Sequence, residues 1–287
     1  MRYHAQLNID GLVGPTHMYG GFSFGNLASM AHQGLMSSPK QAALEGLKKM
    51  KVCADAGIIQ AVFPPQNRPC IKTLRKLGFT GTDDQVVKQC SKEDQELFLA
   101  CSSSSSMWMA NAAIMTPKWD SIDQKNHITP ANLVHGFHRS IESPFLKELF
   151  EKIWGKNKDW IIHNPITNSF SDEGAANHMR FCNQYNQKGI HLFVYGKKKL
   201  QTNIFQKFPA RQSYEASASI KRHHQLEDHQ VVFAKQNPNA VEKGVFHNDV
   251  IAMGDQSLLI CHEYAFENQL EIINSLRYKM EAVCKVP

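Results

Sequence analysis

The chain has 287 residues, of which 42% are hydrophobic and 20% are charged. This composition is ordinary for a globular protein and excludes a disordered chain, which would be poor in apolar residues and rich in one charge. The formal net charge of +6 comes from 32 basic and 26 acidic residues that are scattered along the chain. It therefore gives no indication of nucleic-acid binding. The length allows one large domain or two small ones, and we expect a single domain over residues 1–287.

No run approaches the roughly 18–20 apolar residues that a membrane helix needs, so membrane binding is not expected. The N-terminus shows no apolar segment after a basic start, which argues against a secretory signal. Seven cysteines lie at wide spacings without a C-x-x-C motif. They indicate reduced thiols in a cytoplasmic protein.

The first 36 residues begin with a predicted strand at 5–9 and contain six glycines. Such a loop is typical of backbone that approaches a ligand closely, but an irregular surface loop is equally compatible. A helix then follows, with Ser38 as its N-cap, Pro39 in its first turn and Gly57 just past its end. Short helices are expected at 71–77, 83–90 and 92–99.

Five serines occupy positions 102–106. A serine run on its own would suggest a flexible linker, but the apolar segment MWMANAA follows at once. We therefore expect a buried turn that enters a helix or strand. Residues 129–154 have a helical pattern that is interrupted near Ser143 and Pro144.

The second half alternates strands with helices and loops. The strongest strand signal is at 190–195, and a turn at Gly254 and Asp255 predicts a hairpin between two later strands. No tandem repeat is visible in the sequence. We expect an α/β protein with strands at 160–162, 190–195, 230–234, 245–253 and 257–262, and helices at 211–224 and 268–283.

Several familiar motifs are absent from the sequence. There is no G-x-G-x-x-G, phosphate-binding loop or G-x-S-x-G elbow, so nucleotide binding and a serine nucleophile of that type are unsupported. The histidines at 223, 224 and 229 fit a solvated helix end better than a metal site, because no carboxylate or thiol lies at ligand spacing.

The best local signal for chemistry is the segment FHNDVIA. On a strand, His247 and Asp249 would point to the same face. An imidazole beside a carboxylate suits proton transfer next to a bound cation, whereas a polar edge facing solvent is the structural alternative.

Three other segments carry weaker signals. Glu173 lies in DEGAANH, which indicates either a tight, partly buried turn or an ordinary helix start. Arg211 is predicted to open a helix, where it could bind a carboxylate at two points or make a surface ion pair. His138 and Arg139 follow His135 by one helical turn.

Together these segments resemble the N-succinylarginine dihydrolase family. The matching stretches run in order along nearly the whole chain: IDGLVGPTHMYGGFSFGNLAS, KQAALEGLKKMK, QAVFPPQNRP, SSSSSMWMANAA, FHRS, DEGAANH, LFVYG, PARQ, FAKQNP and GVFHNDVIA. Many short motifs in register are far more specific than any one of them.

The resemblance implies a pentein-type α/β-propeller of ββαβ modules. It also implies hydrolysis of N2-succinyl-L-arginine to N2-succinyl-L-ornithine, two ammonia and carbon dioxide, without a cofactor or metal. A homodimer is expected on the same ground. Glu173 and His247 would be catalytic. The implied substrate-binding residues are Gly20, Gly21, Phe22, Ser23, Phe24, Gly25, Asn26, Leu27, Ala28, Ser29, Asn111, His138, Arg139, Arg211 and Asp249.

In this scheme Asp249 holds the planar guanidinium, and His247 protonates the departing ammonia and later activates water. The resemblance places the cysteine nucleophile in a C-terminal portion that this sequence lacks, so we expect a truncated, incomplete propeller. Two alternatives stay open: an inactive remnant that only binds acylated arginine, and a guanidine deiminase that releases one ammonia. We expect Glu173, Arg211, His247 and Asp249 to line one pocket.

Overall fold

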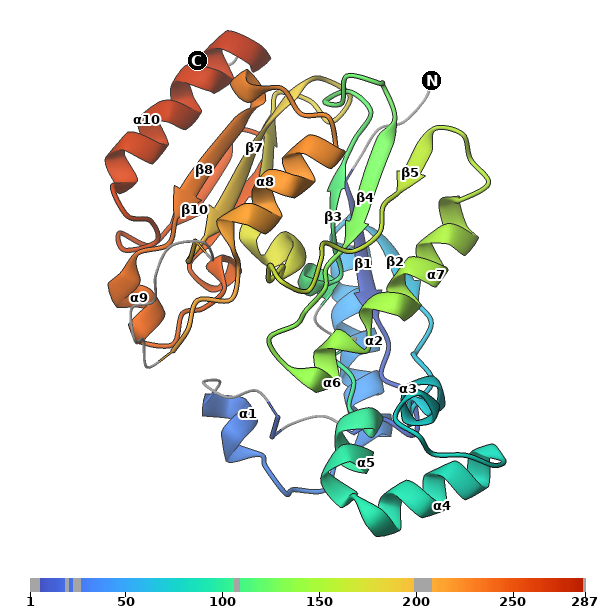
Figure 1. The fold of residues 1–287 in the computed structure, drawn as a ribbon. Coiled ribbons are helices and arrows are strands. Elements are labelled where there is room, and N and C mark those ends of the chain that lie inside the picture. The colour runs from blue at the N-terminus through green and yellow to red at the C-terminus, as the bar shows by residue number, and fades with distance from the viewer. Residues whose placement is uncertain (1–5, 19–20, 23–26, 106–108, 199–207, 286–287) are drawn as a thin grey trace. The chain divides into compact units, whose positions relative to one another are not determined.

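The computed structural model describes residues 6–18, 21–22, 27–105, 109–198 and 208–285 (Figure 1). These residues form two compact units. The larger unit contains Ala110–Leu133 and the described residues from 146 to 285. The smaller unit contains the described residues from 6 to 109 together with Val134–Phe145.

The smaller unit is built on a parallel strand pair that is joined by a helix. Strand β1 (Leu7–Gly11) pairs with β2 (Ile59–Phe63), and α2 (Pro39–Asp55) lies between them in the chain. As predicted, α2 starts at Pro39 and stops before Gly57, whose φ of +87° suits glycine. The other helices of this unit are α1 (Leu27–Ala31), α3 (Ile71–Lys76), α4 (Asp83–Glu93), α5 (Gln95–Ser102) and α6 (Phe137–Ser140).

The serine run is part of the packed interior of the smaller unit. Ser102, Ser103 and Ser104 are all buried, and Ser103 forms a parallel bridge with Met18. The expected burial is confirmed for these residues, but they form the end of α5 and an extended bridge rather than a turn, and Ser106 lies outside the described residues.

The larger unit contains two sheets in which the strands and one helix follow the same order along the chain. In each of two three-stranded sheets, the first two strands are antiparallel and the second and third are parallel. A helix precedes the third strand each time, which gives the ββαβ order that the family resemblance implies. The sheets are β3 (Ala113–Thr116), β4 (Asn126–Pro130) and β5 (Trp160–Ile162), with α7 (Ser143–Trp154), and β6 (His178–Cys182), β7 (Gly189–Tyr195) and β8 (Val231–Lys235), with α8 (Tyr214–His223).

A third group of elements follows the same order as far as its helix. Strands β9 (Ala252–Asp255) and β10 (Leu258–Cys261) form the predicted antiparallel hairpin, and α10 (Gln269–Lys279) follows. The remaining helical segments are η1 (Met109–Asn111), η2 (Gly174–Asn177), η3 (Asp228–Gln230), α9 (Pro238–Glu242), η4 (Asn248–Val250) and η5 (Met280–Cys284).

Strand β7 forms the centre of the larger core and is covered on both faces. Leu192 and Val194 pack in one apolar cluster with Leu276 of α10. Phe193, between them in the strand, packs in a second cluster with Ile220 of α8. Because successive strand residues point to opposite faces, α10 and α8 cover opposite sides of this sheet (Figure 1).

Three sequence predictions about elements are wrong. Thr129 lies in strand β4, so the predicted helix over 129–154 is present only as α6 and α7. The predicted strand over 245–253 is instead the turn η4 followed by β9. Arg211 precedes helix α8, which has Ser213 as its N-cap.

Among the described residues, no helix combines the length and apolar character needed to cross a membrane. All seven cysteines lie in the described ranges and are free thiols, as predicted.

Candidate active site

The turn that carries Glu173 is held by side chains that are distant in sequence. Gln212 accepts the Glu173 N–H through Oε1 at 2.7 Å, and Asn111 donates from Nδ2 to the Glu173 carbonyl at 2.9 Å. Asn132 accepts the N–H of Asp172 through Oδ1 at 3.0 Å. A buried turn lacks the ladder hydrogen bonds of a helix or strand, so these side chains replace them. The backbone of Glu173 is therefore fixed before any ligand binds.

Gly174 completes this turn and has to be glycine. Its φ is +70°, and a Cβ at this position would lie 3.0 Å from the carbonyl carbon of Asn111. Larger residues therefore meet both an unfavourable backbone conformation and a neighbouring main chain. The Gly174 N–H donates to Asp172 Oδ1 at 3.2 Å, which closes the turn.

Asp172 is a second buried carboxyl group directly beside Glu173. It is fully buried, and its Oδ1 accepts from Gly174 and from Gln212 Nε2, each at 3.2 Å. Loss of solvent, opposed by these two hydrogen bonds and reinforced by the charge of Glu173, raises the pKa of Asp172 to about 7.

Glu173 and His247 form a close carboxylate–imidazole pair. His247 Nε2 lies 2.7 Å from Glu173 Oε2, and the exposed fractions of the two side chains are 13% and 0%. Such a contact holds the imidazole in one orientation. The side chain of His247 is thus the partly accessible member that could exchange a proton with a ligand.

Arg211 reaches this pair through an aromatic ring. Its guanidinium carbon lies 3.7 Å from the ring centroid of Phe246, and the Phe246 ring meets that of His247 edge-on at 5.0 Å. Arg211 is buried. The Phe246 ring thus contacts both the Arg211 cation and the His247 member of the acid–base pair.

Asp249 follows His247 by two residues but is not on a strand. It belongs to the turn η4, and His247 is the N-cap of that turn. Partial loss of solvent raises the pKa of the Asp249 carboxyl, the charge of His247 lowers it and that of Glu173 raises it. The carboxyl therefore lies within electrostatic reach of the pair, although it lies on a turn and not on the predicted strand.

The predicted site residues divide between the two units. Asn111, Glu173, Arg211, His247 and Asp249 belong to the larger unit and are linked by the contacts above. In that group, Asn111 donates its side-chain amide N–H to the Glu173 carbonyl, so it supports the turn that carries Glu173.

The other predicted residues belong to the smaller unit. His138 and Arg139 are buried on α6, and Phe22 lies 5.4 Å from the His138 ring, centroid to centroid. The N–H of Gly21 donates to Ser29, which joins the two ends of the predicted loop. Leu27 and Ala28 begin α1, while Gly20, Ser23, Phe24, Gly25 and Asn26 lie outside the described residues.

Four residues that the sequence reading did not single out complete the site: Asn132, Asp172, Gln212 and Phe246. Three of these lie next to predicted residues, within the DEGAANH, PARQ and GVFHNDVIA segments. The hydrogen bonds of Asn132 and Gln212 reach segments about 40 positions away, so only the fold reveals these contacts.

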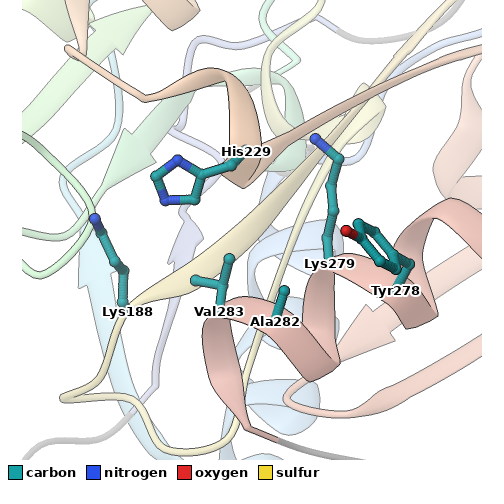
Figure 2. Close-up of a pocket in the computed structure, with 6 residues that line it drawn as sticks. All are labelled: Lys188, His229, Tyr278, Lys279, Ala282 and Val283. Carbon is teal, nitrogen blue, oxygen red and sulfur yellow. The ribbon is translucent and has the colours of Figure 1, made fainter.

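The site lies at the carboxyl end of β7, where Gly196 donates its N–H to the Gln212 carbonyl. Ligands of open α/β sheets commonly bind beyond this end of the strands. Figure 2 shows a different cavity, of about 470 Å³, lined by Lys188, His229, Tyr278, Lys279, Ala282 and Val283. Lys188 directly precedes β7, and a seven-residue strand spans roughly 20 Å. This cavity is therefore separate from the candidate site.

The cations of that cavity already have partners. Lys188 pairs with Glu227 at 2.7 Å, and Lys279 donates to the carbonyls of Asp228 and Val231. An anion would have to displace these contacts, so the cavity offers no ready binding site.

Of the three histidines near the end of α8, His223 and His229 are exposed as expected, whereas His224 is fully buried, which corrects the expectation for that residue. Both ring nitrogens of His224 are engaged, with Thr116 Oγ1 at 2.7 Å and Thr129 Oγ1 at 2.8 Å. Burial holds the pKa of His224 well below its ordinary value. Within the described ranges, no group of histidine, cysteine and carboxylate residues could hold a metal ion.

Comparison with known sequences identifies relatives over almost the full chain. A family model described as succinylarginine dihydrolase matches residues 3–286. The N-succinylarginine dihydrolase of Photobacterium profundum is 46% identical over 285 residues, which cover 98% of this chain and 64% of the relative. That of Shewanella putrefaciens is 49% identical over 282 residues, covering 97% and 64%. The chain thus spans just under two thirds of the length of these relatives.

Solved structures show the same type of fold. ArgZ, an arginine dihydrolase from cyanobacteria, matches with a TM-score of 0.56 at 15% identity, over 94% of this chain and 29% of that chain. The substrate-bound N-terminal domain of ArgZ matches with a TM-score of 0.52 at 13% identity, over 96% and 71%. At this identity the likeness supports the mixed α/β, pentein-like fold alone. Because the family model spans nearly all residues, the chain belongs to the succinylarginine dihydrolase family.

Proposed function

We propose that this chain supplies the guanidinium-binding and acid–base residues of an N-succinylarginine dihydrolase. The reaction converts N2-succinyl-L-arginine and two waters into N2-succinyl-L-ornithine, two ammonia and carbon dioxide. The observation that carries this proposal is the close pair of buried Glu173 and partly exposed His247 beside the stacked cation of Arg211. Membership in the family supports the choice of substrate.

The charges of the site match the two ends of this substrate. A guanidinium is a planar cation, and the carboxylates of Glu173 and Asp249 would hold it by charge-assisted hydrogen bonds. Arg211 would pair with a substrate carboxylate, for which its planar fork of N–H donors is suited. The site would thus bind a molecule that is cationic at one end and anionic at the other.

His247 would carry the protons of the reaction. Its partly exposed ring is held by Glu173 at 2.7 Å. As an imidazolium it would donate a proton to departing ammonia, and the resulting neutral ring would accept one from an attacking water. Glu173 would orient His247 and stabilise its positive charge through both steps.

The remaining expectations from the family are also proposals. The residues from Gly20 to Ser29, together with His138 and Arg139, would contact the substrate. The cysteine nucleophile would come from the part of the family's length that this sequence does not span. We further propose that the ββαβ modules belong to a closed propeller, and that the protein is a cytoplasmic homodimer.

A second candidate is binding of acylated arginine without turnover by this chain, and the state of its thiols favours it. A nucleophilic cysteine needs a lowered pKa. Burial instead raises the thiol pKa of Cys101 to about 12 and that of Cys284, near Cys182, to about 11. It also raises the thiol pKa of Cys182 and Cys261.

The test combines calorimetry with an ammonia assay on the chain and on a His247→Ala variant, each supplied with the portion of the family's length that this sequence does not span. Binding of N2-succinyl-L-arginine with release of two ammonia per substrate supports the dihydrolase. Binding with no ammonia above the His247→Ala background supports the binding-only candidate, and one ammonia per substrate supports a deiminase. Absence of saturable binding would refute the proposed function.

A further inference from the structure

Phe246 lies between the two charged parts of the candidate site. The guanidinium carbon of Arg211 sits 3.7 Å from its ring centroid. The ring of His247 meets it at 5.0 Å and an interplanar angle of 83°. The face of Phe246 therefore contacts the cation, and His247 approaches the same ring in an edge-to-face arrangement.

This stack orients the Arg211 side chain. A cation is attracted to the electron-rich face of an aromatic ring, and the attraction is stronger where both groups are desolvated. Arg211 is only 5% exposed, so solvent screens the contact little. The stack occupies a face of the guanidinium, whereas its N–H donors lie in the guanidinium plane. Those donors are thus directed sideways, as recognition of a carboxylate requires.

The same ring restrains His247. Edge-to-face aromatic pairs contribute beyond simple burial, and Glu173 Oε2 contacts Nε2 of the imidazole at 2.7 Å. His247 is thereby held between a carboxylate and the Phe246 ring. Movement of Phe246 would displace both Arg211 and His247.

We propose that Phe246 is a positioning residue that sets the spacing between the carboxylate-binding cation and the acid–base pair. This inference rests on the proposed function. It adds a specificity rule: a preferred substrate carries a carboxylate at a fixed distance from its guanidinium. The stack does not increase the affinity for a guanidinium compound that has no carboxylate.

The test compares Phe246→Leu with Phe246→Tyr, which retains the aromatic face. Phe233→Leu is the matched control, because Phe233 is also a partly buried ring of the larger unit, stacked 5.7 Å from Phe193. Calorimetry measures the affinity for N2-succinyl-L-arginine and for agmatine, a guanidinium compound without a carboxylate. The ring-current shift of the Arg211 Nε–H resonance, assigned with Arg211→Lys, reports the stack without any ligand.

Phe246→Leu should weaken N2-succinyl-L-arginine binding about 10-fold with little effect on agmatine, and should remove the ring-current shift. Phe246→Tyr and Phe233→Leu should retain both the affinity and the shift. Unchanged affinity in Phe246→Leu, equal weakening for both ligands, or an unchanged resonance would overturn the inference. If the parent chain shows the shift but fails to bind N2-succinyl-L-arginine, both the specificity rule and the proposed function are refuted. The stacking of Arg211 on Phe246 is still supported in that case.

Discussion

Replacement of Asp172 by asparagine should change how the stability of the protein depends on pH. The side chain is fully buried, and its pKa is raised from 3.8 to about 7. One pKa unit corresponds to about 1.4 kcal/mol. Ionising Asp172 therefore costs the folded state about 4 kcal/mol relative to the unfolded chain.

The sign of this pH dependence follows from the number of protons that the folded and unfolded states bind. Between about pH 4 and pH 7 the folded state keeps the Asp172 proton while the unfolded chain has lost it. The stabilising contribution of the protonated form is complete below the unfolded pKa and is lost as the pH rises through the folded pKa. The parent should therefore lose about 4 kcal/mol of unfolding free energy over this range through Asp172, and Asp172→Asn should not.

Urea unfolding at a series of pH values measures this difference. Tryptophan fluorescence is a suitable signal because Trp154 and Trp160 stack at 4.6 Å within the larger unit. Asp159→Asn, at an exposed aspartate of the same unit, is the matched control and should follow the parent. Parallel stability curves for the parent and Asp172→Asn between pH 4 and pH 8 would show that Asp172 ionises at its ordinary pKa, and would refute the reasoning.

Two further substitutions test the packing of the larger unit. Gly174→Ala should cost about 1–3 kcal/mol of unfolding free energy, because φ at this position is +70° and the new Cβ would press on Asn111; a neutral effect in urea unfolding would contradict this. Asp120→Ala should cost about 3–5 kcal/mol, because it leaves Arg180 and His191 without their buried partner. Burial acts to raise the pKa of Asp120, yet hydrogen bonds from His191 and Arg180 hold it well below its usual range. The parent should therefore lose stability as the pH falls toward that low value, an acid sensitivity that Asp120→Ala should lack.

Local sequence signals predicted those elements whose ends are set by their own residues. Helix α2 begins at Pro39 and stops before Gly57 as expected. Strand β7 was predicted because it is apolar on both faces, a property that follows from its central position. Such signals need no information from distant parts of the chain.

The failures occur where tertiary contacts decide the conformation. Thr129 was assigned to a helical pattern, but its hydroxyl binds buried His224 from strand β4. The segment around Asn248 looked like an alternating strand, yet it forms a turn that places His247 against Glu173, 74 positions away. Local periodicity does not encode a contact at that separation.

The candidate site likewise combines features that local sequence predicts with features that depend on tertiary contacts. Motif resemblance identified Glu173, His247 and Arg211, but gave no reason why Glu173 should be rigid. That reason lies in Gln212 and Asn111, whose hydrogen bonds to the Glu173 backbone join segments 39 and 62 residues apart. The candidate site residues could thus be named from motifs, whereas the residues that hold their backbone could not.

A crystal structure of the chain with N2-succinyl-L-arginine would test the account most directly. We expect the guanidinium to lie within hydrogen-bonding distance of Glu173 and next to His247, with a carboxylate of the ligand on Arg211. A ligand bound in the reverse orientation, or away from the pair of Glu173 and His247, would contradict it.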